Sequence, residues 1–384
     1  MKVGVPKEIK THEYRVGLTP ESVREYVHRG HEVFVETQAG AGIGAGDDAY
    51  RHAGATVLPD ARAVFDAAEL IVKVKEPQPA ELAMLQPRHL LFTYLHLAPD
   101  PQQAQGLIDS GCAAIAYETV IEADGSLPLL APMSEVAGRL SINVAGQLLM
   151  RNAGGPGLLL GGVTGVAPAR VLVLGAGVAG AQAVRMAAGA GAEVTVVNRS
   201  LPRLRALEAQ LPGRIRTRPS THSAIEEELA AADVVVGAVL VAGASTPRLV
   251  TRAMLRTMKP RSVIVDISID QGGCCETSHP TTHAEPTYEV DGIVHYCVAN
   301  MPGAVPRTSS HALNLATLPY GLALADHGLD ALRTSAALRA GLNVLAGRIT
   351  HPMVAQALGR EFVDPAQALA APAAGHPVER RSQG

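Results

Sequence analysis

The chain has 384 residues, of which 47% are hydrophobic and 18% are charged, and its formal net charge is -3. This length exceeds one ordinary core and predicts two domains, and the apolar content argues against a disordered chain. The small net charge gives no support for binding to nucleic acid or to a membrane surface. Trp is absent and only 3% of residues are aromatic, which argues against a platform for stacking bases.

The cysteines and the apolar segments indicate the compartment. Four cysteines are no disulfide framework in a chain of this length, so we expect a reducing, cytoplasmic environment. The first ten residues carry several charges and lack the apolar region of a secretory signal. The longest apolar region, 171–197, is interrupted by glycines, so we expect no membrane span.

The first 130 residues alternate short apolar runs with helical patterns. Strands are predicted at 2–5, 32–36, 70–74, 90–94 and 113–117. Helices are predicted at 20–29, 60–66 and 101–110. Such alternation is typical of a parallel α/β sheet.

A second alternating series occupies the middle of the chain. Ser134 has the features of an N-cap for a helix over 135–151, and the glycine-rich segment 152–168 is expected to be a loop. Strands are predicted at 170–174, 193–198, 233–236 and 262–266. After Pro306 the patterns are helical, from 308–327 to about residue 369, and the tail 371–384 is expected to be disordered.

A glycine-rich segment carries the fingerprint of a dinucleotide-binding turn. The strand 171–174 leads into Gly175-Ala-Gly177-Val178-Ala179-Gly180, and a helical run follows. In this context the first glycine permits the tight turn, the second lets the backbone approach a pyrophosphate, and the third lets helix and strand pack closely. The free N–H groups of the helix N-terminus would bind the phosphates. The alternative is a glycine-rich turn without a ligand.

A second glycine-rich segment, 40–46, has the spacing G-x-G-x-G-x-G, which misplaces the third glycine. Asp47 and Asp48 follow it and would repel a phosphate. We therefore expect a flexible surface loop there.

Several longer motifs carry a family resemblance. The opening V-G-V-P-K-E (3–8) and R-V-G-L-T-P (15–20) resemble the superfamily of alanine dehydrogenases and transhydrogenase α-subunits. The stretches K-V-K-E-P (73–77), Y-L-H-L-A (94–98), P-M-S-E-V (132–136), V-D-I-S-I-D-Q-G-G (265–273) and Y-C-V-A-N-M-P-G (296–303) look specifically like alanine dehydrogenase. The resemblance covers about residues 1–370.

The resemblance implies a fold and an activity. It implies two Rossmann-like, doubly wound domains with a cleft between them: a substrate domain formed by 1–130 plus 306–370, and an NAD(P)-binding domain at 131–305. It implies a reversible oxidative deamination of L-alanine to pyruvate and ammonia, and a homo-oligomer, hexameric in the family.

Two cations match the substrate-binding positions of the family. Arg15 would bind the substrate carboxylate through two parallel hydrogen bonds. Its alternative is a surface arginine that pairs with Glu13. Lys75, just after a buried strand, would bind the carboxylate or the carbonyl as a point charge. Its alternative is an ordinary lysine at a strand end.

Two further residues match the catalytic positions. His96 ends a predicted strand, and an imidazole suits proton exchange with the amine and the carbinolamine. Asp270 follows a strand of the cofactor domain and could orient or deprotonate water. The alternatives are a structural or exposed histidine and a turn aspartate that caps its loop. Asp266 is expected to lie at the end of its strand without a catalytic role.

The remaining cofactor contacts come from the resemblance. Ser134 and the segment 298–301, with Val298, Asn300 and Met301, match positions beside the nicotinamide. The matches to other cofactor contacts are Ser220, Val239, Leu240 and Ile267.

The main departure from the family is Asn198, where an aspartate usually accepts the ribose hydroxyls and repels a 2′-phosphate. Here Arg199 and Ser200 follow, with Arg203 and Arg205 beyond, as in Rossmann enzymes that use NADP. We therefore expect NAD as cofactor and keep NADP open. A second departure is His279, where an arginine is common.

Metal binding is not expected. Cys274, Cys275, His279 and His283 are close in sequence, but adjacent cysteines do not easily face one ion and no second C-x-x-C motif exists. Some family members bind magnesium on the late helix, where this chain has His327 but Ala323.

Three other functions remain open at this stage. A related amino-acid or imino-acid dehydrogenase would differ only in substrate. A transhydrogenase NAD-binding subunit would lack the pair His96 and Asp270. A catalytically silent dinucleotide sensor would bind the cofactor without turnover.

Overall fold

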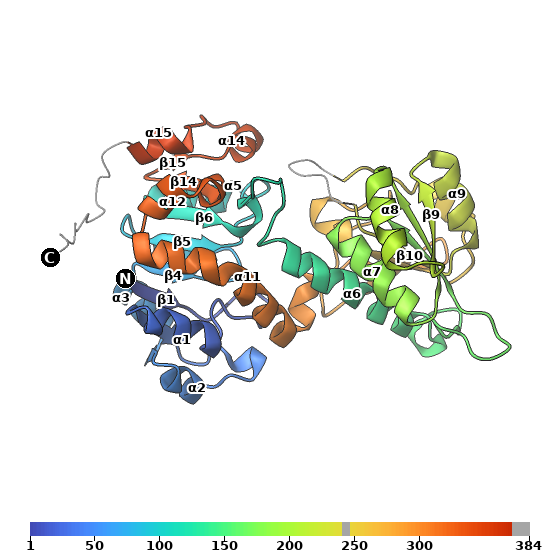
Figure 1. Ribbon diagram of the computed structural model, residues 1–384, viewed down its shortest axis with the longest axis horizontal. Helices are drawn as coiled ribbons and strands as arrows, with labels where there is room; N and C mark the ends of the chain where they lie inside the picture. The colour runs from blue at the N-terminus through green and yellow to red at the C-terminus, as the bar shows by residue number, and fades with distance from the viewer. Residues whose placement is uncertain (240–245, 371–384) are drawn as a thin grey trace. The chain divides into compact units, whose positions relative to one another are not determined.

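The computed structural model describes residues 1–239 and 246–370, and the chain divides into two units. Unit 1 is Met1–Pro132 together with the segment that starts at Val305, and unit 2 is Met133–Ala304. Each unit contains one mostly parallel sheet with helices on both faces (Figure 1). None of the helices in the described residues is both long and apolar enough to cross a membrane.

The sheet of unit 1 has the strand order β15-β14-β6-β5-β4-β1-β2-β3. Its strands are β1 (Lys2–Val5), β2 (Glu32–Glu36), β3 (Thr56–Leu58), β4 (Leu70–Val72), β5 (Leu90–Thr93), β6 (Ala113–Ala116), β14 (Leu342–Leu345) and β15 (Arg348–Ile349). The first six pair in parallel, and β14 pairs antiparallel with both β6 and β15. The late segment of the chain therefore extends the sheet that the N-terminal residues begin.

Helices cover both faces of this sheet. They are α1 (Pro20–His28), α2 (Asp47–His52), α3 (Ala61–Ala67), α4 (Pro79–Leu82), α5 (Pro101–Ser110), α11 (Pro306–His327), α12 (Asp330–Thr334), α13 (Ala336–Gly341), α14 (Pro352–Leu358) and α15 (Pro365–Ala370). Phe65 of α3, Leu107 of α5 and Val354 of α14 share one apolar cluster with Leu91 of the sheet. Helix α11 contacts β4 and α1, and Figure 1 shows it lying across the sheet.

The sheet of unit 2 has the order β12-β13-β11-β10-β7-β8-β9. Its strands are β7 (Arg170–Leu174), β8 (Glu193–Asn198), β9 (Ile215–Pro219), β10 (Val234–Gly237), β11 (Val263–Asp266), β12 (Thr287–Val290) and β13 (Ile293–Tyr296), and its helices are α6 (Ala131–Leu148), α7 (Val178–Gly189), α8 (Leu201–Gln210), α9 (His222–Ala231) and α10 (Arg252–Leu255). All pairs are parallel except β12 with β13.

The alternation of side chains along β7 explains why unit 2 has two cores. Val171 and Val173 join the cluster under α6, α7 and α8, whereas Leu172 and Leu174 join the cluster under α9 and α10. A strand buried on both faces needs such a continuous apolar run, because successive side chains point to opposite faces.

The fold class predicted from the sequence is confirmed, and several local predictions are wrong. The helix predicted at 135–151 runs over Ala131–Leu148, so Ser134 lies inside its first turns and is not the N-cap. Pro132 is tolerated there because the N–H groups of a first turn have no partner within the helix. The helical prediction after Pro306 also missed the hairpin of β14 and β15.

The glycine-rich segment 40–46 is ordered by specific contacts rather than being a free loop. Residues Ala41–Ile43 form a 3₁₀ turn, and a Cβ on Gly42 would lie 2.2 Å from the carbonyl oxygen of Tyr14. Asp47 accepts hydrogen bonds from the Thr37 hydroxyl and from the backbone N–H of Gln38, so its carboxylate holds the segment.

Candidate functional site

The sheet of unit 1 changes direction between β1 and β4. The chain proceeds from β1 to β2 on one side and from β4 to β5 on the other. Loops that leave two such strands diverge, and ligands of open α/β sheets bind at this point, beyond the carboxyl ends of the strands. Arg15 lies in the connection after β1, and Lys75 follows β4.

Arg15 is only 2% exposed, and Glu13 fixes the plane of its guanidinium. Its Nε donates to Glu13 Oε1 at 2.7 Å, and its Nη2 donates to Glu13 Oε2 at 2.5 Å. Burial by itself lowers the pKa of Arg15, but the bonds to Glu13 outweigh burial and raise it, so the guanidinium stays charged. The alternative predicted that Arg15 pairs with Glu13 at the surface. The pair is present, but both residues are buried.

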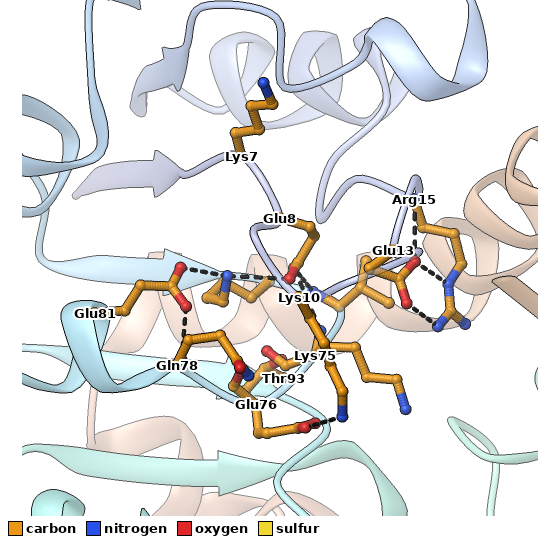
Figure 2. A network of polar contacts seen from close by, with 12 residues as sticks. Lys7, Glu8, Lys10, Glu13, Arg15, Lys75, Glu76, Gln78, Glu81 and Thr93 are labelled. Atoms are coloured by element: carbon orange, nitrogen blue, oxygen red, sulfur yellow. Dashed lines mark hydrogen bonds and ion pairs between the residues drawn. The ribbon is translucent and has the colours of Figure 1, made fainter. Parts of the chain in front are cut away.

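Lys75 is 9% exposed and is held through its backbone. Its N–H donates to Glu8 Oε1 at 3.3 Å, and its carbonyl oxygen accepts from the Thr93 hydroxyl at 2.9 Å. Figure 2 shows these side chains together with Arg15 and Glu13. Glu8 thus links the loop after β1 to the segment after β4 by a hydrogen bond.

His96 follows β5 and has an unusual backbone. Its φ is +48°, in the left-handed region that few non-glycine residues adopt. Glu118, just after β6, accepts the N–H of His96 at 2.6 Å and that of Leu95 at 3.1 Å. The His96 ring is 44% exposed, stacks on Tyr94 with an interplanar angle of 7°, and has Nδ1 4.0 Å from Glu118 Oε1.

The sheet of unit 2 changes direction between β7 and β10, and the glycine fingerprint lies there. Gly175 has φ +106°, and a Cβ on it would lie 2.4 Å from the carbonyl oxygen of Ala238. A Cβ on Gly180 would lie 1.9 Å from the carbonyl oxygen of Gly175, so helix α7 can only approach the turn with glycine at that position. Gly177 precedes α7 and has open space beside it.

The second strand of the fingerprint ends in Asn198, whose side chain stabilises the turn. Its Oδ1 accepts the N–H of Ala176 at 3.1 Å, and its Nδ2 donates to the carbonyl oxygen of Ser200 at 3.1 Å. Ser220 follows β9, and its N–H donates to the carbonyl oxygen of Asn198. Arg199 and Arg203 are exposed at the start of α8.

Asp270 lies in a 3₁₀ turn, Ile267–Gln271, directly after β11, and its side chain is exposed. The cap of this turn is Asp266, not Asp270: the buried Asp266 carboxylate accepts the N–H of Ser268 at 3.1 Å. The Ser268 hydroxyl in turn accepts the N–H of Val239 at 2.9 Å. The alternative that Asp270 caps its own loop is therefore wrong.

Comparison with known proteins identifies the family. A model of the alanine dehydrogenase/PNT N-terminal domain matches residues 4–137, and a model of the C-terminal domain of the same family matches residues 141–352. The chain belongs to the alanine dehydrogenase/PNT family. Alanine dehydrogenase of Halomonas elongata is 56% identical over 96% of this chain and 100% of its own length, and that of Mycobacterium tuberculosis H37Rv is 50% identical over the same shares.

Solved structures agree with this assignment. A structure titled L-alanine dehydrogenase superposes with a TM-score of 0.91 at 52% identity, covering 94% of this chain and 99% of that one. A transhydrogenase from Sinorhizobium meliloti superposes with a TM-score of 0.80 at 24% identity, covering 91% of this chain and 100% of its own. The second likeness concerns the fold alone.

The other residues that the family resemblance assigned to the cofactor lie in unit 2 or at its start. Ser134 is half-buried in α6, and Val298 and Met301 are buried after β13. Asn300 has φ +65°, and its carbonyl oxygen lies 3.1 Å from His283 Nε2. Leu240 lies outside the described residues.

The cysteine-rich segment differs from expectation in one respect. Cys274 Sγ and Cys275 Sγ are 3.9 Å apart and lie close to the Asp266 carboxylate, so adjacent cysteines do converge here. However, Asp266 Oδ2 already accepts from the Cys274 N–H at 2.8 Å and the Ser278 hydroxyl at 2.6 Å, and the Cys275 thiol and burial raise the pKa of Cys274. His279 and His283 do not join this group; His279 stacks on Tyr288.

Reasoning from the sequence missed two acidic residues that hold candidate functional groups. Glu8 binds the backbone of Lys75, and Glu118 binds that of His96. The available signal was their position shortly after predicted strands. Glu13 was considered only as the partner of an exposed Arg15, and the pair is buried.

Proposed function

We propose that this protein catalyses the reversible, NAD-dependent oxidative deamination of L-alanine to pyruvate and ammonia. The observation that carries the proposal is that Arg15, Lys75 and His96 follow β1, β4 and β5 at the carboxyl edge of neighbouring parallel strands, in a chain that is 56% and 50% identical to two alanine dehydrogenases over 96% of its length. The balanced reaction takes up L-alanine, water and NAD⁺ and yields pyruvate, ammonium, NADH and a proton.

Arg15 and Lys75 hold the substrate in this proposal. A planar guanidinium whose orientation is already fixed by Glu13 loses little entropy when it binds a carboxylate. The Lys75 ammonium supplies a second positive charge, directed at the carboxylate or at the carbonyl of pyruvate. Together they fix the orientation of Cα.

His96 and Asp270 move protons. The exposed imidazole of His96 takes the proton of the substrate ammonium and returns one to the carbinolamine. Asp270 orients and deprotonates the water that attacks the iminium carbon. NAD⁺, held by the Gly175–Gly180 turn, would supply the acceptor for the hydride of Cα.

The residues of the fingerprint fit a dinucleotide. Gly175 and Gly180 allow the tight turn, and the open space at Gly177 admits a pyrophosphate at the N-terminus of α7. We propose that NAD is used and that NADP is accepted better than in relatives with aspartate at position 198, because Asn198 adds no negative charge and the exposed Arg199 can pair with a 2′-phosphate.

Two other functions, a transhydrogenase subunit and a catalytically silent dinucleotide sensor, lead to different expectations. A transhydrogenase subunit is disfavoured because the solved transhydrogenase is 24% identical to this chain, against 56% and 50% for two alanine dehydrogenases. A silent sensor would bind NADH without turnover. We also propose a cytoplasmic homo-oligomer, on the family resemblance.

The test is a steady-state absorbance assay of pyruvate plus ammonia with NADH and with NADPH, and of L-alanine with NAD⁺. We expect turnover in both directions. Binding of NADH without turnover of alanine, of other amino acids or of imino acids would favour the sensor, and turnover of another amino acid in preference to alanine would correct the substrate.

A further inference from the structure

A buried ionic triad lies beside Lys75. Lys73 is fully buried, and its Nζ donates to Glu81 Oε1 at 2.6 Å and to Glu8 Oε2 at 3.1 Å. Glu8 and Glu81 are 7% and 1% exposed. Burial raises the pKa of Glu8, and the Lys73 ammonium opposes this effect. Charges removed from water in this way are costly unless each is paired, so the arrangement calls for a function.

The triad determines the backbone that carries Lys75. Glu8 Oε1 accepts the N–H of Val74 at 2.7 Å and that of Lys75 at 3.3 Å, while the other oxygen of the same carboxylate faces Lys73. Glu81 Oε2 accepts the N–H of Gln78 at 2.8 Å, which ties the start of α4 to the same group. Figure 2 shows Glu8 and Glu81 joined in one chain of contacts.

Two further side chains donate hydrogen bonds to the backbone of the segment 73–75. The Tyr117 hydroxyl donates to the carbonyl oxygen of Lys73 at 2.9 Å, and the Thr93 hydroxyl donates to that of Lys75 at 2.9 Å. The segment 73–75 lies just beyond β4, where two backbone hydrogen bonds still join it to the neighbouring chain: the Lys73 N–H donates to the Phe92 carbonyl oxygen at 3.2 Å, and the Tyr94 N–H donates to that of Val74 at 3.3 Å. The side chains add to these bonds. The ammonium of Lys75 is therefore carried by a backbone with little freedom.

We propose that Glu8, oriented by Lys73 and Glu81, is a positioning residue that fixes the backbone of Lys75 and thereby sets the affinity for the substrate carboxylate. The inference rests on the proposed function, in which Lys75 binds that carboxylate. Glu8 itself need not touch the substrate.

The decisive variant is Glu8→Gln. An amide has one acceptor end and one donor end, so it cannot accept from Lys73 and from the two backbone N–H groups at once. We expect the KM for pyruvate and for L-alanine to rise by about tenfold, the effect of losing one charge-assisted hydrogen bond, while the KM for NADH changes by less than about twofold.

A double variant that restores the KM for pyruvate distinguishes a positioning role of Glu8 from a role in stability alone. In the double variant Glu8→Gln/Lys73→Met the ammonium no longer competes for the amide oxygen, which can turn to the backbone N–H groups. We expect the KM for pyruvate to return toward the parent value. Glu8→Asp keeps the charge but is one methylene too short to reach both partners, and it should also raise this KM.

The matched control is Glu36→Gln. Glu36 is a half-buried carboxylate whose Oε2 accepts the N–H of Lys7. Burial raises its pKa as it does for Glu8, and the Lys73 ammonium opposes this effect, but Glu36 accepts no backbone N–H of the described segment 73–75. Its substrate KM should stay at the parent value.

The outcomes separate the two proposals. If the parent turns over alanine but the pyruvate KM is unchanged in Glu8→Gln and Glu8→Asp, the positioning role is wrong and the proposed function stands. The same holds if the KM for NADH rises as much as the KM for pyruvate. Loss of folded protein in both variants, judged by circular dichroism, assigns Glu8 a structural role instead. A parent without turnover of alanine or pyruvate overturns the proposed function and this inference with it.

Discussion

The His96 side chain is directed by its backbone, and Glu118 is the residue that holds that backbone. A left-handed conformation costs a non-glycine residue about 1–3 kcal/mol, so it persists only where the surroundings impose it. Here one carboxylate accepts both the His96 and the Leu95 N–H groups. Glu118 also faces His351, whose pKa burial lowers and Glu118 raises in part.

The first prediction compares His96 with Glu118. His96→Ala should lower kcat by about a hundred- to ten-thousand-fold, the range for removal of a general acid or base. Glu118→Ala frees the turn and should lower kcat by about tenfold or more, since charge-assisted bonds to two N–H groups are lost. The control is Glu122→Gln, a nearby carboxylate that binds Tyr320. Near-parent turnover in Glu118→Ala would show that the imidazole is directed by other contacts.

The second prediction concerns His89, a buried histidine whose pKa burial lowers to about 4. Its Nδ1 accepts the Gln86 N–H at 3.0 Å, and its Nε2 lies 2.9 Å from the Phe65 carbonyl oxygen, so the neutral ring fits both partners. The unfolded chain binds a proton below about pH 6.5, but the folded chain does so only near pH 4. The neutral ring therefore stabilises the fold above pH 6.5, and this contribution is lost as the pH falls toward 4.

The measurement is the free energy of unfolding from pH 7 to pH 4, by urea titration. Between pH 7 and pH 4, the free energy of unfolding should fall by up to about 3 kcal/mol less in His89→Gln than in the parent. The exposed His28→Gln serves as control. Parallel pH curves for the parent and His89→Gln would refute the assignment.

At the scale of single residues, motifs in the sequence mark the candidate site residues but not the carboxylates that hold them. Arg15, Lys75 and His96 are marked in this way, and their roles stay predictions. Glu8 and Lys73 are 65 positions apart, and Glu118 lies 22 positions after His96. Such partners meet only through strand pairing. Their positions after predicted strands were visible in the sequence, but no local pattern shows which residue each one binds. Burial of Arg15 was missed for the same reason.

At the scale of elements, close backbone approach is decided by glycines. Gly180 lets α7 approach the end of β7, and Gly138 lets α6 approach α7, where a Cβ would lie 2.1 Å from the carbonyl oxygen of Ala179. The nearest atoms that an added methyl group would meet are backbone atoms, which cannot turn away. The two glycines thereby allow α7 to lie close to the turn at 175–177 and α6 to lie close to α7.

The third prediction is a loss of stability in Gly180→Ala. Overpacking against the Gly175 carbonyl should cost about 1–3 kcal/mol of unfolding free energy in unit 2 and should raise the KM for NADH. Gly189→Ala is the matched control on the same helix, because its Cβ meets nothing within 4 Å. That change should be neutral or slightly stabilising. Equal unfolding midpoints for the two variants would contradict the packing argument.

Errors in the predicted elements have physical causes. Ser134 resembled an N-cap because serine is a preferred N-cap residue and an apolar-periodic run follows it, but α6 begins three residues earlier at Ala131, and Met133 and Val136 are buried within it. Strands β14 and β15 were missed because each is short and stands between helices, where length and periodicity carry little information. Pairing with β6, 226 or more positions earlier, makes β14 a strand.

At the scale of the whole molecule, the alternation of strands and helices predicted two α/β units, but pattern alone could not show that one of them is discontinuous. The chain leaves unit 1 near Pro132 and returns to it at Val305. The return depends on contacts of α11 with α1 and β4, which are long-range. The family resemblance supplied what periodicity could not.

The fourth prediction uses the stability of the whole protein as a measure of cofactor choice. A ligand that binds only the folded state stabilises it by about 2.7 kcal/mol at a hundred times its Kd, which raises the unfolding temperature. NADH should therefore stabilise the parent and Asn198→Asp alike, since a carboxylate can still accept the Ala176 N–H that Asn198 accepts. NADPH should stabilise the parent but not Asn198→Asp, because two negative charges about 4 Å apart repel by up to about 4 kcal/mol before screening.

The arginines provide a second comparison. Arg199→Ala should weaken the stabilisation by NADPH. Arg205 is also exposed but lies further along the chain, within α8, so Arg205→Ala should leave that stabilisation unchanged. Equal shifts with NADPH in the parent and in Asn198→Asp would mean that position 198 does not face the 2′-phosphate, and the cofactor preference would then rest on other residues.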